Sequence, residues 1–404
     1  MVALAMLAII AGCAAFLFLK GTLVQGITMI LNVIIAGFVA LAFYEMLVPL
    51  LVKYAASIAD WAPVICFGLL LILTFAILQT AAMQLGKEKV DLGKLPEQIG
   101  RVVCGVVLGY LVTGHVLVAA AMAPLPSQYP YPRFEQRNPN PSKPNKAMLS
   151  PDGFVTGLFA TVSRGSFSGI REPKSFAMLH AGYLDQLYLN RCKFSQKVWT
   201  TTSAPAFDKP KGAVWPAPDS LRDSDGKPLG ARPGENLMLA RVELKNRALR
   251  EGAKLTLSQI RLVCGPKGGA RGSLAGQGTA TYPVGYIGAN NRLERKSLDD
   301  VLAEQSSEAM TAMDVAFYVP ANLTPRLLEF RNSDAIPVSL PASGEEAPVM
   351  ISYPGSSAAP KNEAAQPQQE PPAPAPPQPR SREPDREKTL SERTKGLVPD
   401  QIEH

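Results

Sequence analysis

The feature that most constrains this chain is an abrupt change in composition after Pro124. Up to that residue Ala, Val, Leu, Ile, Gly and Phe dominate, and beyond it Pro, Ser and charged residues become frequent. A helix that crosses the hydrocarbon core of a bilayer needs about 20 mostly apolar residues. We therefore expect the first part of the chain to lie in a membrane and the remainder in water.

Four segments of the front part meet this length requirement. They are Val2 to Leu19, Leu23 to Val52, Ala62 to Leu85 and Val102 to Met122. Pro63 falls in the first turn of the third segment, where the missing N–H costs no helical hydrogen bond. The pattern predicts four transmembrane helices within residues 1–125.

A cleaved signal sequence is the alternative for the first segment, because Ile10-Ala11-Gly12-Cys13 resembles a lipoprotein cleavage box. No positive charge precedes that run, however, and the chain stays apolar from Ala14 to Leu19. A mature lipoprotein would continue with a polar tether. These features favour an uncleaved span.

Loop charges predict the orientation of the spans. Basic residues gather between the first and second spans and between the third and fourth: Lys20, Lys87, Lys89, Lys94 and Arg101. The loop between the second and third spans carries only Lys53 and Asp60. Because positive loops remain cytoplasmic, we expect a multi-pass protein of the inner (cytoplasmic) membrane with an extracytoplasmic C-terminal region.

Few polar residues interrupt the spans: Asn32, Glu45, Gln79 and His115. Uncompensated polar groups are costly in lipid, so these side chains should face the bundle or an interface. Glu45 and His115 should lie within about two helical turns in depth, at ~1.5 Å per residue. A proton or ion path would use such groups, whereas snorkelling of Glu45 and an interhelical hydrogen bond from His115 are the structural alternative, which we favour.

Gly105, Gly109 and Gly114 are small residues on the fourth span. The first two have the four-residue spacing that lets another helix backbone approach closely. We expect packing inside the four-helix bundle, and a homo-oligomer interface is the alternative use of the same motif.

The front part resembles the CvpA family, the colicin V production proteins. Lys20-Gly21 is similar to the basic-Gly pair after that family's first helix, and the stretch from Leu95 to Leu117 is similar to the family signature around its last helix. Gly105 and Gly109 match two signature glycines. Arg101 stands in place of the first glycine, and Leu108 stands where the family has an arginine.

The soluble part divides into four regions by composition. We expect a linker over 126–149, a helical and irregular connecting region over 150–232, a β-sandwich over 233–345, and a disordered tail over 346–404. Ser150 and Pro151 are typical of a helix start, which predicts a helix over 151–163. Apolar spacing predicts a second helix from Lys174 to Arg191.

Alternation of apolar and polar residues predicts strands between Gly234 and Leu340. Met238, Ala240, Val242 and Leu244 show this period, and Met313, Val315, Phe317 and Val319 repeat it. A charged stretch over 292–312 is typical of a short helix inserted between strands. The segment from Val315 to Phe330 resembles a late strand pair of small immunoglobulin-like domains. From about Pro354 the chain has too few hydrophobic residues to form a core.

Known catalytic and metal-binding signatures are missing from the sequence. No CxxC, HExxH, GxSxG or nucleotide-binding fingerprint occurs, and His180 has no constellation of cysteines or carboxylates near it in the sequence. We therefore expect no cofactor, no metal site and no enzyme activity. The net charge of +7 comes without a dense basic block, which argues against nucleic acid as a partner. A location outside the cytoplasm would allow a Cys192–Cys264 disulfide.

Three functional hypotheses follow. The resemblance to CvpA implies an envelope scaffold, or an accessory to colicin V production or secretion and to envelope maintenance. Besides the lipid bilayer, its expected partners are a second copy of the chain and an unidentified envelope protein or cell-wall component. The alternative is an oligomeric channel or transporter formed by the four-helix part. An enzyme acting on envelope material ranks third.

Overall fold

The computed structural model describes much of the chain up to residue 353. The described ranges are 2–85, 93–165, 174–191, 207–209, 211–229, 232–245, 254–268, 273–304, 310–331, 334–341 and 346–353. They all belong to one compact unit, Met1–Ala358. The tail predicted beyond residue 353 lies outside the described residues.

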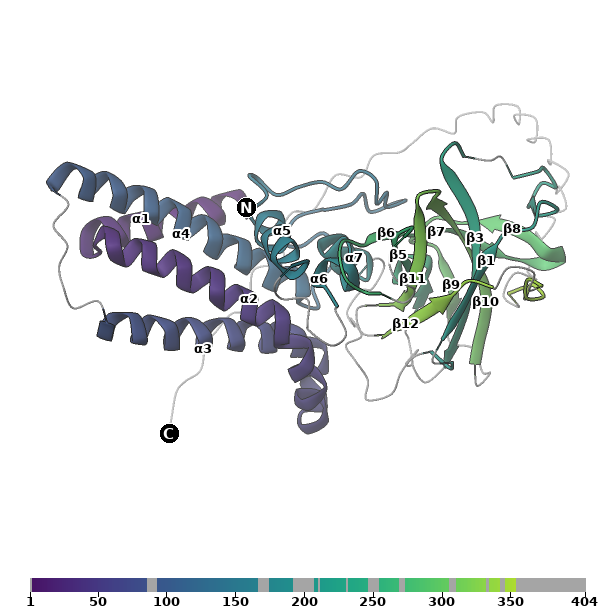
Figure 1. Cartoon of the computed structure of the whole chain (residues 1–404), viewed down its shortest axis with the longest axis horizontal. Coiled ribbons are helices and arrows are strands. Elements are labelled where there is room, and N and C mark those ends of the chain that lie inside the picture. The colour runs from purple at the N-terminus through teal and green to yellow at the C-terminus, as the bar shows by residue number, and fades with distance from the viewer. Residues whose placement is uncertain are drawn as a thin grey trace, which may run out of the picture. The chain divides into compact units, whose positions relative to one another are not determined.

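Four long helices form the N-terminal bundle (Figure 1). They are α1 (Val2–Lys20), α2 (Leu23–Tyr54), α3 (Ala62–Leu85) and α4 (Lys94–Met122). A 3₁₀ turn, η1 (Ala56–Trp61), joins α2 to α3. At the start of α2, the Thr22 side chain accepts from the backbone of Gln25, whose side chain accepts from Thr22 in return. This capping box satisfies two N–H groups that a helix start otherwise leaves unpaired.

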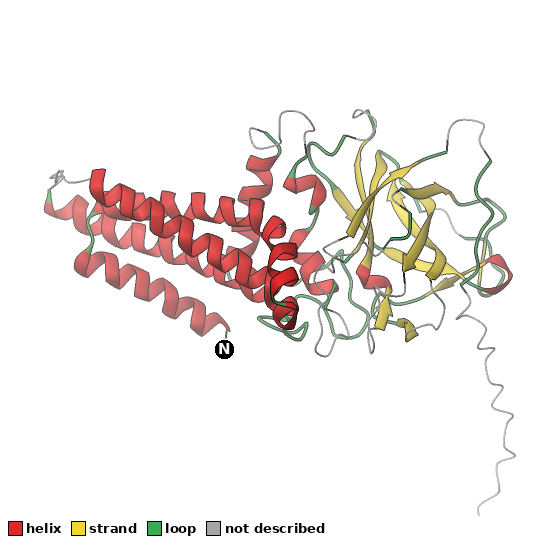
Figure 2. Cartoon of the chain, turned by 90° about the horizontal axis from the view of Figure 1, so that it is seen from below, coloured by secondary structure: helices red, strands yellow, loops and turns green. Residues whose placement is uncertain are grey.

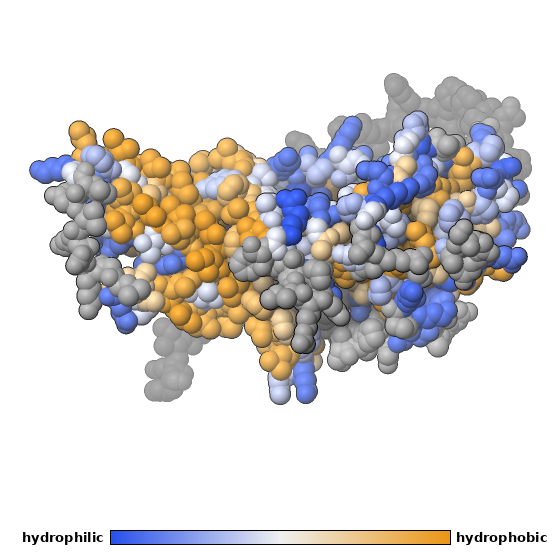
Figure 3. Space-filling model, viewed as in Figure 1, coloured by the Kyte–Doolittle hydropathy of each residue, from blue (hydrophilic) through white to orange (hydrophobic). Residues whose placement is uncertain are grey.

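All four helices are long and apolar enough to cross a membrane, which confirms the four predicted spans. Their outward side chains are apolar: Leu4, Leu19 and Ile72 are each at least 70% exposed in the protein alone. Figure 3 shows this apolar surface on the visible face of the bundle, next to the more polar surface of the rest of the chain. A large exposed apolar surface of this kind marks a site of contact with a membrane or with another protein.

Three short helices lie between the bundle and the sheet (Figures 1 and 2). They are α5 (Pro151–Ser163), α6 (Phe176–Leu179) and α7 (Tyr183–Leu189). The helix predicted over 151–163 is confirmed, but the single helix predicted from Lys174 to Arg191 is wrong. Gly182 interrupts it with a φ of +64°, a conformation that glycine adopts without steric cost.

The C-terminal part of the described chain is a β domain. Its strands are β1 (Gly212–Pro216), β2 (Arg222–Asp223), β3 (Glu235–Lys245), β4 (Lys254–Thr256), β5 (Ile260–Pro266), β6 (Thr279–Thr281), β7 (Pro283–Ile287), β8 (Arg292–Arg295), β9 (Val301–Glu304), β10 (Met310–Pro320), β11 (Leu323–Phe330) and β12 (Asp334–Ser339). Short 3₁₀ turns lie at Leu257–Gln259 (η3) and Ala289–Asn291 (η4). One sheet has the order β2-β8-β7-β10-β3-β1-β12-β11-β5-β6, and β4 pairs with β9 separately.

The predicted β content is present, but the immunoglobulin-like sandwich is not confirmed. Instead of two separate sheets, β1 pairs in parallel with β12 and antiparallel with β3, so it joins both halves into one mixed sheet. Val242 of β3 and Leu328 of β11 belong to one hydrophobic core. The two halves of the sheet therefore share a core even though they are hydrogen-bonded into a single sheet.

Three further expectations need correction. The charged stretch over 292–312 forms strands β8 and β9 and the start of β10 in its described residues, not a helix. The tail predicted over 346–404 is wrong for residues 346–353, because Tyr353 is buried and the Ile351 N–H donates to Asp314. The apolar residues from Val349 to Tyr353 explain this packing. The sheet also starts earlier than residue 233, with β1 and β2.

Candidate functional site

A polar junction connects α2 to the segment formed by α6 and α7. The Tyr44 hydroxyl donates to Glu45 Oε1 at 2.8 Å and contacts the Tyr183 hydroxyl, also at 2.8 Å. Since Tyr44 has only one hydroxyl proton, Tyr183 is the donor to Tyr44. His180 Nε2 lies 3.4 Å from Glu45 Oε2. A carboxylate near the end of a membrane helix is thus paired with groups from outside the bundle.

A second part of the junction connects the same segment to the sheet. Arg261 of β5 and Glu329 of β11 are opposite each other in register. Arg261 Nε and Nη2 lie 2.8 and 2.7 Å from Glu329 Oε2. Arg261 Nη1 also donates to the Ala181 carbonyl at 2.6 Å, and Gln186 of α7 donates to Glu329 Oε1. One buried ion pair therefore holds the α6–α7 segment against the sheet.

The chain leaving α4 is fixed by a third group of contacts. Arg191 is almost fully buried, and its guanidinium donates to the carbonyls of Ala123, Leu125 and Tyr129. These carbonyls lie immediately after the fourth span. Buried backbone acceptors need such donors, since an unpaired one costs about 1–3 kcal/mol.

The predicted linker over 126–149 is part of this packing and is not a solvated spacer. Tyr131 is buried and donates to Asp152 Oδ2 at 2.5 Å. Arg133 Nε lies 2.6 Å from Asp185 Oδ1, and its Nη1 donates to Tyr131 at 3.1 Å. These contacts of Tyr131 and Arg133 place α5 and α7 next to the end of the bundle.

Charge in the junction is governed by burial and pairing together. Burial opposes the charged form of His180, but the Glu45 carboxylate outweighs it, so the pKa of His180 is raised. Burial raises the pKa of Asp185, although the Arg133 guanidinium opposes the shift. Burial likewise raises the pKa of Glu329 against the effect of Arg261. The arrangement can hold a proton in a fixed geometry.

The four polar residues predicted inside the spans fall into three groups. Asn32 Nδ2 donates to Gln79 Oε1 at 2.9 Å, which links α2 to α3. Glu45 belongs to the junction. His115 is buried with Nδ1 2.8 Å from the Leu111 carbonyl, and its ring lies against Gly37, where a Cβ would come within 2.0 Å of Nε2. No hydrogen bond between these described residues joins the groups into a path.

Gly105, Gly109 and Gly114 of α4 lie where other backbones approach. A Cβ on Gly105 would come within 2.5 Å of Ala14 Cα, and one on Gly109 within 2.6 Å of Ile10 Cα. Both contacts are with α1 of the same chain. A Cβ on Gly114 would come within 2.5 Å of the Pro151 carbonyl oxygen at the start of α5.

The predicted disulfide stays a prediction, because Cys192 lies outside the described residues. Cys264 is a buried free thiol in β5, and burial raises its pKa to about 12. Among the described residues, no group of three or more His, Cys, Asp or Glu side chains is placed to hold a metal ion.

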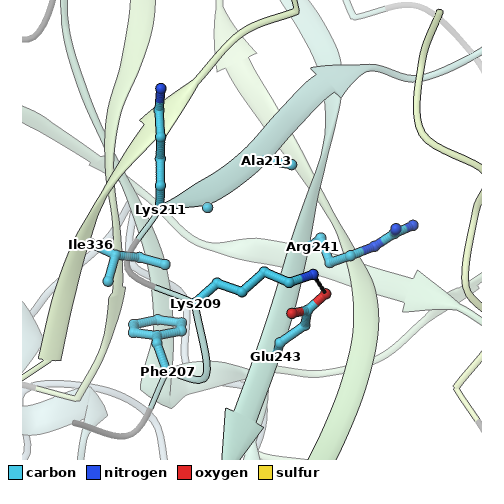
Figure 4. Close-up of a pocket in the computed structure, with 8 residues that line it drawn as sticks. Phe207, Lys209, Lys211, Ala213, Arg241, Glu243 and Ile336 are labelled. Carbon is cyan, nitrogen blue, oxygen red and sulfur yellow. Dashed lines mark hydrogen bonds and ion pairs between the residues drawn. The ribbon is translucent and has the colours of Figure 1, made fainter.

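A small basic pocket in the sheet is less suited to a function. It has a volume of about 110 Å³, and Phe207 and Ile336 form its apolar side. Figure 4 shows Lys209 reaching across to Glu243, at 2.8 Å, whereas the Lys211 and Arg241 side chains extend away from it. A cavity of this size holds only a few water molecules.

Sequence reasoning missed most of the junction. His180 was read as having no constellation of carboxylates near it, and its partner Glu45 lies on a different part of the fold. The sequence does contain a sign of the Arg261–Glu329 pair. Arg261 lies between the apolar residues Ile260 and Leu262. Glu329 lies between the apolar residues Leu328 and Phe330. Buried charges are almost always paired, so they are candidates for one another.

The bundle and the junction define a class of protein: a multi-pass membrane protein whose helices carry a mixed β-sheet domain at one end. Comparison with protein families gives a match for the N-terminal part. Residues 2–137 match the family described as Colicin V production protein, in agreement with the resemblance of the front part to the CvpA family. The match covers the four spans and the segment after them. No curated protein and no solved structure was found to match the chain.

Proposed function

We propose that this chain is an envelope scaffold of the inner membrane. Its four helices anchor the β domain at the extracytoplasmic face, where the domain binds an envelope protein or cell-wall component. In this role it is an accessory to toxin (colicin V) production or secretion and to envelope maintenance. The proposal assigns no catalytic activity and no cofactor to the chain.

The observation that carries this proposal is the buried junction between bundle and sheet. Glu45 of α2 pairs with His180, Arg261 contacts the carbonyls around α6, and Arg191 holds the exit from α4. A domain that only has to be kept near the membrane needs no such contacts, because a flexible linker would hold it there. A scaffold, by contrast, must present its binding surface in a fixed orientation to the membrane.

The proposed side of the membrane rests on the loop charges. In Figure 1, the end of α1, the start of α2, the end of α3 and the start of α4 lie at the end of the bundle opposite to the β domain. Lys20 is the last residue of α1, Lys94 is the first residue of α4, and Arg101 follows in α4. The first residues of α1 lie at the same end as the β domain. If basic loops are retained in the cytoplasm, the β domain is extracytoplasmic.

The channel or transporter alternative has less support. Its predicted groups separate into the Asn32–Gln79 pair, the Glu45 junction and the isolated His115. Flux of protons or ions through reconstituted protein, abolished by His115→Leu, would favour it over the scaffold.

The test of the scaffold is complementation in cells that lack the chain. Full-length protein, a form lacking residues 127–404, and His115→Leu would be compared for resistance to detergent and for colicin V production. We expect full-length protein and His115→Leu to complement and the truncated form to fail at equal membrane abundance. Complementation by the truncated form would refute the scaffold role. In-cell crosslinking from the β domain, with the truncated form as control, would then identify the partner.

A further inference from the structure

The outward face of α5 and of the residues just before it is apolar. Leu149 is 70% exposed and Phe154 is 49% exposed. They lie together on Tyr110 of α4, whose hydroxyl donates to the Leu149 carbonyl and whose ring contacts that of Phe154. Asp152 is the one charged residue from 147 to 163, and it is buried. This exposed apolar group lies outside the four spans and marks a contact site.

The first span provides a depth scale along α4. A Cβ on Gly105 would meet Ala14 and one on Gly109 would meet Ile10, so α1 and α4 run in opposite directions. Counting from Ile10 and from Gly109 toward the β domain puts the first residue of α1 level with Leu117. The 19 residues of α1 extend over about 28 Å, nearly the whole hydrocarbon thickness of about 30 Å. The hydrocarbon therefore reaches about as far as Leu117 on the β-domain side.

The start of α5 lies inside this depth range. A Cβ on Gly114 would come within 2.5 Å of the Pro151 carbonyl oxygen, and the Tyr110 hydroxyl lies 3.0 Å from the Leu149 carbonyl oxygen. Gly114 and Tyr110 are three and seven residues from Leu117 along α4, away from the β domain. At ~1.5 Å per residue, they lie about 5 Å and about 10 Å inside the hydrocarbon. The first turn of α5 is therefore below the level of the headgroups.

The rest of α5 stays at a similar depth. Phe159 packs on Phe38 of α2, with 5.4 Å between the ring centroids. Gly37, next to Phe38, lies against His115 of α4, and His115 follows Gly114 in the chain. The contacts of α5 with α4 and with α2 are therefore nearly level with one another. The helix crosses the bundle instead of running along it.

The hydroxyl group on the exposed face of α5 is satisfied within the helix. Thr161 is exposed and donates to the Gly157 carbonyl at 2.9 Å. Thr28 and Thr80 of the spans donate in the same way to the carbonyl four residues earlier. A polar group that faces lipid needs such an internal partner, because hydrocarbon offers none. Arg164, just after α5, donates to the Thr161 hydroxyl, and a side chain of this length reaches the headgroups from an apolar surface.

We propose that α5 and the turn before it form a membrane element in the leaflet on the β-domain side, with Leu149 and Phe154 among the acyl chains. This surface is continuous with the lipid-facing surface of the bundle. Val106 and Val107, one turn before Tyr110 on the same face of α4, are 44% and 40% exposed. The inference goes beyond the scaffold role, which requires only the four spans in the membrane.

The test measures the depth of single nitroxide labels on full-length protein in nanodiscs, after its own cysteines are replaced. Oxygen concentrates in hydrocarbon and a nickel chelate stays in water, so the ratio of their collision rates with the label reports depth. We expect Leu149→Cys and Phe154→Cys to give a ratio like that of Ile72→Cys, on the lipid-facing side of α3. Val349→Cys, at an 87% exposed apolar residue of the β domain, is the matched control and should give a ratio several-fold lower.

Thr161→Cys is the second probe of α5 and serves if a labelled variant fails to elute as folded protein from gel filtration. Ratios at Leu149→Cys and Phe154→Cys equal to that of Val349→Cys would place α5 in water and overturn the proposal. Low collision rates with both reagents would show that this face is covered by protein, such as a second copy of the chain, and would overturn it as well.

Discussion

Glu329→Ala should open the β domain by breaking the buried ion pair between β5 and β11. The Glu329 and Arg261 side chains are only 2% and 3% exposed. Removing the carboxylate leaves a buried guanidinium without its counter-ion and deprives Gln186 of an acceptor. Loss of one partner of such a pair costs about 3–5 kcal/mol. We expect a loss of this size in the free energy of unfolding of the sheet.

The Cys264 thiol provides the assay. It is fully buried in β5, which pairs with β11 around Arg261 and Glu329. In full-length protein with its other cysteines replaced, the rate of Cys264 alkylation reports how often these strands separate. A cost of 3–5 kcal/mol should accelerate alkylation by about 100- to 4,000-fold.

Glu235→Ala is the matched control, because it removes a strand glutamate from an exposed pair. Arg232 and Glu235 lie 3.7 Å apart with side chains 52% and 33% exposed. Exposed pairs contribute about 0–1 kcal/mol, so alkylation should change by less than about tenfold. If the alkylation rate in Glu329→Ala also changes by less than about tenfold, the buried pair does not hold β5 and β11 together and the reasoning is refuted.

Three other predictions concern the bundle, the junction and the orientation. Gly109→Ala should destabilise the bundle by about 1–3 kcal/mol, because its Cβ would meet the backbone of α1. Gly68→Ala is the control and should not destabilise the bundle, because a Cβ at Gly68 has nothing within 4 Å. Thermal unfolding in detergent measures both. Because the pKa of His180 is raised above its usual 6.5, the folded chain binds that proton more tightly than the unfolded chain. Hydrogen-exchange protection of α6 and α7 should therefore be greatest below pH 6.5 and fall as the pH rises through the folded pKa of His180. The Glu45 and Glu329 carboxylates favour the protonated imidazole, whereas the Arg261 guanidinium opposes it. His180→Gln should make the protection independent of pH in this range. An alkaline phosphatase fused after Pro126 should be active, because that end of α4 is extracytoplasmic. An inactive fusion at equal abundance would contradict this orientation.

The membrane part could be predicted from sequence because its signal is local. About 20 consecutive apolar residues define a span whatever lies elsewhere, and all four were found. The helix after Ser150 was also local, resting on Pro151 at its first position.

The sheet and the junction depend on contacts that local patterns do not encode. Alternation in β3 and β10 reveals strands but not that β1 pairs in parallel with β12 and merges the halves into one sheet. The Arg261–Glu329 pair joins residues 68 positions apart. A single left-handed residue, Gly182, split a helix that apolar spacing alone predicted to be continuous.

The distance between bundle and β domain tests the central claim most directly. Spin labels at Leu95, on the exposed face near the start of α4, and at Arg295, on exposed β8, would report it in full-length protein without other cysteines. The fixed junction predicts one narrow distance distribution in nanodiscs, which broadens in Glu329→Ala. A broad distribution in the chain with an intact junction would contradict a rigidly held domain, and with it the scaffold.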